Sequence, residues 1–206
     1  MSAPEHVHPG PRVTPPAKRS EQPDRQLVAG LSSAKLLERY AVGVENFDRR
    51  VFSLNDEQLD MAFLPDAKVG RWPVRVLVGH CADAELSFVH RLRRTAAEDG
   101  PVLGAWDENA FIDRGLYGQA TPLAPKGLPI AGAVATIHTL RQWTGEWLRH
   151  AVALEGEGLM QRPAMHTELG PMVLRDILVY SVWHIEHHGW YLNRKVERFL
   201  GPAEGH

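Results

Sequence analysis

Three histidines fall within five residues of one another, at His184, His187 and His188. On a helix, residues four apart project from the same face, so His184 and His188 are able to share one metal ion. Imidazole is a ligand of zinc, copper, iron and nickel, so this pair indicates a class of metal without choosing its member. His187 lies one position off the pair and could instead bond to a backbone carbonyl, a carboxylate or water. Because two ligands hold a metal weakly, a third must come from elsewhere in the chain.

Among the remaining histidines, His80 is the candidate for the third ligand. Only His80 combines a helical setting, an adjacent seam of apolar residues and a helix that is able to face the one carrying His184. His90 has arginines around it and is expected to face water, while His138 and His150 have polar neighbours. Three histidines from two helices would leave coordination positions open, as a catalytic metal site requires.

Two common metal motifs are absent from this cluster. A metalloprotease helix needs glutamate directly after its first histidine, but Ile185 stands there. A di-iron bundle needs histidine three places after glutamate, but Glu186 is followed at that spacing by Gly189.

Apolar residues recur at steps of three and four in four segments, which predicts four amphipathic helices. They cover approximately residues 33–54, 73–98, 134–155 and 172–200, and no segment shows a convincing strand pattern. The sequence therefore predicts an all-α fold, a four-helix bundle with a long crossover between its second and third helices. The expected domain spans residues 26–201, and the proline-rich residues 1–25 are expected to form a disordered tail.

The crossover, residues 102–128, is rich in glycine and proline around an aromatic and acidic segment. A connection of this length inside a compact domain is usually functional or flexible. It is the candidate lid of a small-molecule site, with Trp106, Phe111 and Tyr117 as apolar wall. The alternative is that the segment only crosses the bundle and packs these aromatic side chains into the core.

Composition excludes several classes of partner. The chain of 206 residues has a formal net charge of −2, which gives no reason to expect nucleic acid or an anionic membrane surface. No apolar run approaches the roughly 18–20 residues needed to cross a bilayer. Cys81 is the only cysteine, which excludes an intramolecular disulfide and is typical of a reducing compartment. A cytoplasmic location is the expectation.

Two stretches resemble signatures of the DinB/YfiT-like superfamily. Residues 71–85 read Arg-Trp-Pro-Val-Arg-Val-Leu-Val-Gly-His-Cys-Ala-Asp-Ala-Glu, similar to the tryptophan, histidine and acidic pattern of that family's second helix. Residues 183–188 read Trp-His-Ile-Glu-His-His, similar to its fourth-helix motif. The sequence departs from the pattern at Pro73, where serine is usual, and at Arg75, where an acidic residue is common. Neither position is a candidate ligand.

The resemblance implies a four-helix bundle that binds a divalent metal through His80, His184 and His188. Zinc or nickel is the first expectation for the ion, and iron or manganese is the alternative. The superfamily includes metal-dependent hydrolases and transferases or isomerases that use a low-molecular-weight thiol. The implied function is therefore a metal-dependent enzyme acting on a small molecule through an open coordination site. The rival is a non-enzymatic stress-response or interaction protein that the metal only braces, and a homodimer is the candidate assembly.

Overall fold

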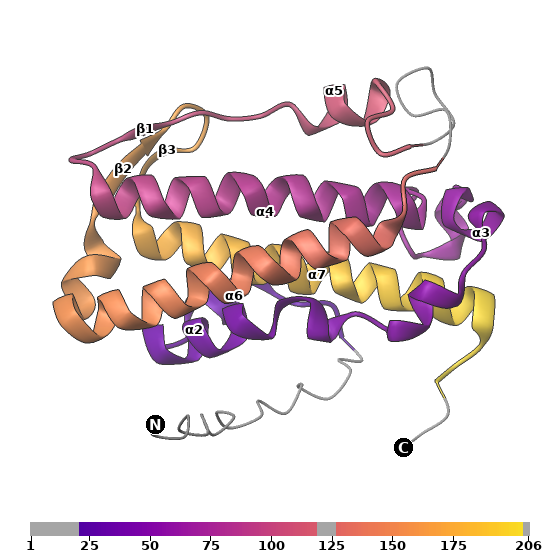
Figure 1. Ribbon diagram of the computed structural model, residues 1–206, viewed down its shortest axis with the longest axis horizontal. Coiled ribbons are helices and arrows are strands. Elements are labelled where there is room, and N and C mark those ends of the chain that lie inside the picture. Colours follow the sequence, from indigo (N-terminus) through magenta and orange to yellow (C-terminus); the bar gives the residue numbers. More distant parts are fainter. Residues whose placement is uncertain (1–20, 119–126, 204–206) are drawn as a thin grey trace, which may run out of the picture.

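The computed structural model describes residues 21–118 and 127–203, so most of the tail expected at residues 1–25 lies outside this part of the chain. Its main body is a four-helix bundle (Figure 1). The four helices are α2 (Ser33–Val42), α4 (Val74–Ala97), α6 (Ile130–Glu155) and α7 (Leu174–Leu200). Helices α6 and α7 lie between α4 and α2 and contact both. The predicted fold class is confirmed, with the long crossover running from α4 to α6.

Shorter elements connect these helices. They are α1 (Arg25–Ala29), η1 (Gly43–Asn46), η2 (Arg49–Ser53), α3 (Asp56–Asp60), η3 (Pro65–Ala67), β1 (Val102–Leu103), α5 (Glu108–Asp113), η4 (Gly156–Gln161), β2 (Pro163–His166) and β3 (Gly170–Val173).

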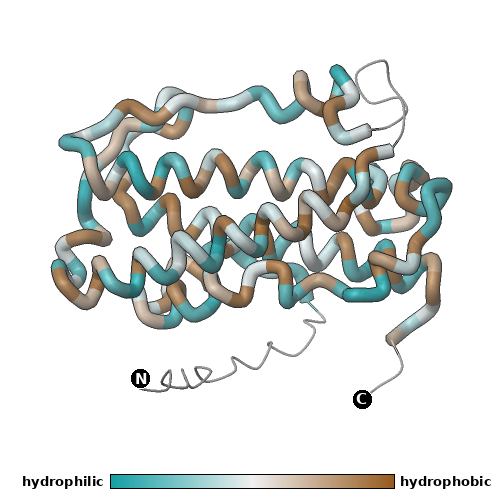
Figure 2. The backbone as a smooth tube through the Cα atoms, viewed as in Figure 1, coloured by the Kyte–Doolittle hydropathy of each residue, from teal (hydrophilic) through white to brown (hydrophobic). Residues whose placement is uncertain are grey.

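The core consists of two clusters of buried apolar side chains, and α4, α6 and α7 contribute to both. Figure 2 shows hydrophobic and hydrophilic stretches alternating along these helices, as amphipathic helices require. On α4 one cluster ends at Ala82 and the other begins at Ala84, and on α7 the change falls between Val182 and Ile185. His184 therefore lies where the two clusters meet. None of the described helices combines the length and hydrophobicity that a bilayer span needs.

The first helix is shorter than its periodicity predicts, because α2 ends at Val42. Gly43 has φ +47°, a conformation that side chains with a Cβ rarely adopt. A Cβ placed there would lie 2.7 Å from Cδ of Arg141, which crosses from α6. The helix therefore stops where the arginine side chain passes, and the chain continues as η1 and η2.

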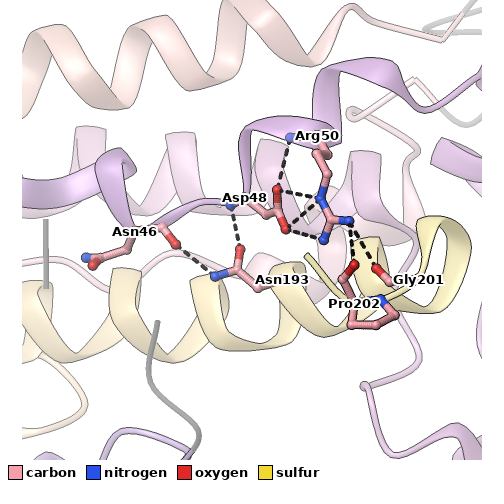
Figure 3. Close-up of polar contacts among 6 residues, drawn as sticks. All are labelled: Asn46, Asp48, Arg50, Asn193, Gly201 and Pro202. Carbon is pink, nitrogen blue, oxygen red and sulfur yellow. Dashed lines mark hydrogen bonds and ion pairs between the residues drawn. The ribbon is translucent and has the colours of Figure 1, made fainter. Parts of the chain in front are cut away.

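Polar contacts fix this irregular continuation against α7 (Figure 3). The amide of Asn193 donates 2.8 Å to the carbonyl of Asn46, and its oxygen accepts from the backbone N–H of Asp48 at 2.6 Å. Arg50 pairs with Asp48 at 2.8 Å and donates to the carbonyl of Gly201 at 3.0 Å. One asparagine side chain thus replaces backbone bonds that a continuing helix would have made.

The structure also contains a small three-stranded sheet, which the sequence patterns did not predict. β1 pairs in parallel with β2, bringing Val102 opposite Met165, and β2 pairs antiparallel with β3. The strands are two to four residues long, too short for an alternating pattern to stand out. The sheet ties the start of the crossover to the chain that leads into α7.

Residues 102–118 of the crossover run alongside α4 (Figure 1), whereas residues 119–126 lie outside the described chain. The ring of Tyr117 is buried against Gly79 of α4. Arg75, also on α4, donates to the carbonyl of Leu128 and pairs with Asp60 at 2.7 Å. Pro73 and Arg75, the two departures from the family pattern, are not members of the histidine cluster. Arg75 instead anchors the end of the crossover.

Replacing Gly79 with alanine is expected to destabilise the protein by about 1–3 kcal/mol. A Cβ at this position would lie 2.4 Å from Cδ1 of Tyr117, so the ring must leave its seat. This cost opposes the gain in helix propensity, which is at most about 1 kcal/mol. Urea unfolding measures the net effect, and limited proteolysis reports whether the crossover has loosened. Gly132→Ala in α6 is the matched control, since a Cβ there meets no heavy atom within 4 Å. Equal stability of the two variants would contradict the seating of Tyr117.

Part of the expected tail packs against the bundle. The carbonyl of Pro23 accepts a 3.1 Å hydrogen bond from the indole of Trp183, and Pro23 is buried. The side chain of Asp24 caps α1 by accepting from the backbone N–H of Gln26. The ordered chain thus includes residues 21–25, which the sequence assigned to the tail.

Candidate metal centre

Three histidines from two helices meet inside the bundle. Nε2 of His80 on α4 lies 3.1 Å from Nε2 of His184 on α7. One turn further along α7, His188 brings a ring nitrogen so that ligand atoms of all three residues lie within 4.8 Å of one another. The i, i+4 spacing on α7 and the facing position on α4 produce this convergence, as the sequence predicted.

Burial keeps these imidazoles neutral. It lowers the pKa of His80 to about 4. The pKa values of His184 and His188 lie well below the usual range, chiefly because of burial and then because of the neighbouring histidines. A neutral imidazole has a free lone pair, which is the state that binds a metal.

The arrangement fits a divalent metal. Two nitrogens that each lie about 2.0–2.1 Å from a tetrahedral ion are separated by about 3.3 Å, close to the 3.1 Å between His80 and His184. Nδ1 of both His80 and His188 is buried with no hydrogen-bond partner among the described residues. In that part of the chain no cysteine or carboxylate joins the group as a fourth ligand. The donor set is therefore three imidazoles with coordination positions left over.

The burial of these histidines predicts how stability depends on pH when metal is absent. A histidine whose folded-state pKa is lowered is protonated preferentially in the unfolded state, so stability is lost as pH falls below about 6.5. For His80 the difference from 6.5 to about 4 corresponds to about 3 kcal/mol, lost progressively between those pH values. Urea unfolding in chelator between pH 7 and pH 5 measures this slope. His80→Phe is expected to reduce the slope, and His138→Ala, an exposed site, to leave it unchanged. A flat profile for the wild-type protein would contradict burial of the three rings as neutral groups.

Aromatic side chains wall the centre on two sides. Trp72, just before α4, has its ring 4.9 Å from the ring of His80 and stacks on His188 at 6.0 Å. Trp106 of the crossover stacks on His80, with 5.6 Å between ring centroids and 22° between ring planes. Phe111 meets Trp106 edge-on at 5.1 Å.

The three crossover aromatics expected at the site therefore differ in position. Trp106 lies against a candidate ligand, and Phe111 lies behind it. Tyr117 packs in the notch above Gly79, one residue before His80. Burial and the nearby Asp83 raise the pKa of its hydroxyl, which stays protonated.

A pocket of about 240 Å³ opens beside the centre. Its lining residues are Val69, Gly70, Arg71, Trp72, Leu77, His188, Tyr191 and Lys195. His188 belongs to both the cluster and the pocket, so a small molecule in the pocket would touch a candidate ligand. The sequence did not identify this pocket. The one sequence feature that could have indicated the pocket is Lys195, a charged residue on the same face of its helix as His184 and His188.

A buried network of polar side chains lies one helical turn from the histidine cluster. Nε of Arg141 on α6 lies 2.8 Å from Glu85 of α4, and its Nη2 donates 2.7 Å to the carbonyl of Ser181 on α7. The hydroxyl of Tyr40 on α2 donates 2.7 Å to the other oxygen of Glu85. Ser181 precedes His184 by one turn, so the network fixes α4 and α7 relative to each other near the cluster. No local sequence pattern indicates that Arg141 pairs with Glu85, because the two residues lie on different helices.

His187 faces away from the cluster. Its Nδ1 lies 3.1 Å from the side-chain nitrogen of Gln22, and its ring lies 4.6 Å from that of Trp183. His187 is outside the three-histidine group, and its partner, the amide of Gln22, is none of the backbone carbonyl, carboxylate or water suggested by the sequence.

Comparisons with known proteins show the family and the fold of the chain. Residues 19–192 match the family model of the DinB superfamily. A "Putative metal-dependent hydrolase" of Oceanobacillus iheyensis is 30% identical over 139 residues, 67% of this chain and 70% of the relative. A protein of Bacillus mycoides with the same description is 21% identical over 82% of this chain and 90% of its own length.

A solved structure shares the architecture. It is described as "YfiT from Bacillus subtilis is a probable metal-dependent hydrolase with an unusual four-helix bundle topology". Its TM-score is 0.66 at 23% identity, covering 84% of this chain and 91% of that one. With the family model matched along most of its length, this chain belongs to the DinB superfamily.

Proposed function

We propose that this protein is a metal-dependent enzyme whose divalent ion is held by His80, His184 and His188. The observation that carries the proposal is the convergence of three neutral imidazoles without a fourth ligand in the described chain. Structural metal sites are usually closed by four protein ligands, whereas catalytic sites keep a position for water or substrate. The pocket that shares His188 gives a small molecule access to such a position.

When bound, a divalent ion at this centre would act as a Lewis acid and lower the pKa of a water molecule or thiol at an open position. The residues of this chain would determine what reaches it. The indoles of Trp72 and Trp106 exclude water from the His80 ring and offer apolar surface to a substrate. Phe111 supports Trp106, and Tyr117 fixes the crossover on α4. In this proposal the crossover is the wall of the site, with Trp106 as its substrate-contacting residue.

Hydrolysis is the first candidate reaction, supported by the descriptions of the relatives. Transfer or isomerisation that uses a low-molecular-weight thiol is the second, and the chemistry around the cluster favours it. In the described chain no carboxylate belongs to the three-histidine group, so that group itself contains no carboxylate general base. A thiol has an ordinary pKa of about 8.5, against about 15.7 for bulk water, so a bound ion would need to lower it less to produce the nucleophile.

One experiment tests the proposal and separates the two reactions. Protein loaded with zinc, nickel, iron or manganese is assayed with chromogenic esters and amides, and separately with a thiol plus an electrophilic chromogenic acceptor. Turnover that chelator removes and His188→Ala lacks supports the proposal, and the substrate set that turns over assigns the reaction. If metal binds but neither set turns over faster than without it, the ion only braces the bundle, as in the rival function.

A further inference from the structure

The pocket beside the histidine cluster contains a buried lysine with no described counter-charge. The Lys195 side chain is only 1% exposed. Its Nζ donates to the carbonyls of Val69 and Gly70, the latter at 2.8 Å, and lies 4.4 Å from the ring centroid of Phe63. Within residues 21–118 and 127–203 no ion pair neutralises this ammonium.

Keeping an unneutralised ammonium in such a place is costly. Two carbonyl dipoles offset part of the desolvation of the charge, but a full counter-charge is missing. Burial accordingly lowers the pKa of Lys195 to about 8, which leaves the side chain mostly charged at neutral pH. The cost is removed if a ligand brings one negative charge into the pocket.

The other charged residue that lines the pocket is also positive. Arg71 stands at its exposed rim, so two cations line it, and no aspartate or glutamate is among the lining residues. Trp72, Leu77 and Tyr191 also line the pocket and supply its apolar and aromatic wall. Two of the three ammonium protons are already donated, which leaves one for a ligand.

We infer that this pocket binds the far end of the substrate, and that Lys195 recognises a carboxylate there. The inference rests on the proposed function, since it places the reacting end of the same molecule at the three-histidine centre. His188 and Lys195 are seven residues apart on α7, which corresponds to about 10 Å along the helix. The substrate class is therefore a small monocarboxylate whose reacting group lies several bonds from its acid group.

The test uses zinc-loaded protein and a series of ω-mercapto carboxylic acids with roughly two to eight methylene groups, which spans this separation. Each acid is compared with its primary amide by isothermal titration calorimetry. In both compounds the thiol sulfur is free to bind the metal, so the two compounds differ only in whether the far end is a carboxylate or an amide. At the fitting length the acid is expected to bind about 10- to 100-fold more tightly than the amide, the range of a hydrogen bond between charged groups.

Lys195→Met is expected to abolish this preference and leave the affinity for the amides within about twofold of the wild type. Arg198→Met is the matched control, because Arg198 donates to the carbonyl of Ala67 near the same loop but does not line the pocket. It is expected to retain the preference. Equal binding of acid and amide by the wild type at every length overturns the inference. So does an acid preference that survives Lys195→Met.

A second arm does not depend on the metal or on the variant. In the presence of chelator, hexanoate is expected to bind the wild-type protein more tightly than hexanamide. NMR spectra should show changes in backbone amide chemical shifts at residues 69–72 and around Lys195. Absence of zinc binding would refute the proposed function, while this comparison would still decide the carboxylate pocket. If Lys195→Met does not fold, the wild-type comparisons of acid with amide decide it alone.

Discussion

Replacing His188 with alanine is expected to weaken zinc binding by at least about 100-fold. Loss of groups that only orient a ligand costs about 10- to 100-fold in metal affinity, and loss of one ligand of three costs more. Because a metal that binds only the folded protein stabilises it by mass action, zinc at 100 times its Kd should raise the free energy of unfolding by about 2.7 kcal/mol. The variant should show almost none of this gain. Calorimetric titration and melting curves with and without chelator measure both effects.

The matched control is His138→Ala, which removes an exposed histidine from α6. It should bind zinc and respond to chelator as the wild type does. His188 is suitable for the test because it is less buried than His184, so its truncation disturbs the core less. Unchanged zinc affinity in His188→Ala would contradict the three-histidine centre, and chelator-insensitive melting of the wild type would indicate a metal-free bundle.

The second large effect is expected from Arg141→Met, which should destabilise the protein by about 3–5 kcal/mol. Arg141 and Glu85 are 1% and 2% exposed, and the substitution leaves the carboxylate buried with only the hydroxyl of Tyr40 as a hydrogen-bond partner among the described residues. Breaking one side of a buried ion pair costs more than the pair itself contributes, because the remaining charge loses its compensation. Urea unfolding at pH 7 measures the change.

A double-mutant cycle separates this cause from lost packing. Glu85→Met combined with Arg141→Met removes both charges and should be less destabilised than Arg141→Met alone. Arg149→Met is the control on the same helix, since its pair with Glu146 is exposed and should contribute at most about 1 kcal/mol. A double variant as unstable as the sum of the single variants would show that the charges do not interact.

The long helices and the histidine cluster were predictable because their signals are local. Apolar residues repeat along α4, α6 and α7 with the helical period, and the i, i+4 histidines of α7 need only a helix to face one way. His80 was identified as the one remaining histidine beside an apolar seam on another helix. The family resemblance rested on the same two stretches.

The features that were missed depend on contacts between distant parts of the chain. The end of α2 at Gly43 is explained by the side chain of Arg141, which belongs to another helix. The sheet arises from three short strands of which two lie beyond α6. The position of Lys195 was visible, but its pocket exists only because the 69–72 loop folds over it. No local pattern encodes such contacts.

The order in which the chain is synthesised restricts when the centre can be assembled. His80 and His184 are 104 residues apart, and both of the α7 ligands follow the whole crossover and α6. At about 5–20 residues per second, a ribosome adds the second ligand roughly 5–20 s after the first. During that interval His80 is a lone imidazole with no partner for an ion. In the proposed function, an ion would therefore complete its three-histidine site only after α7 has been synthesised and packed against α4.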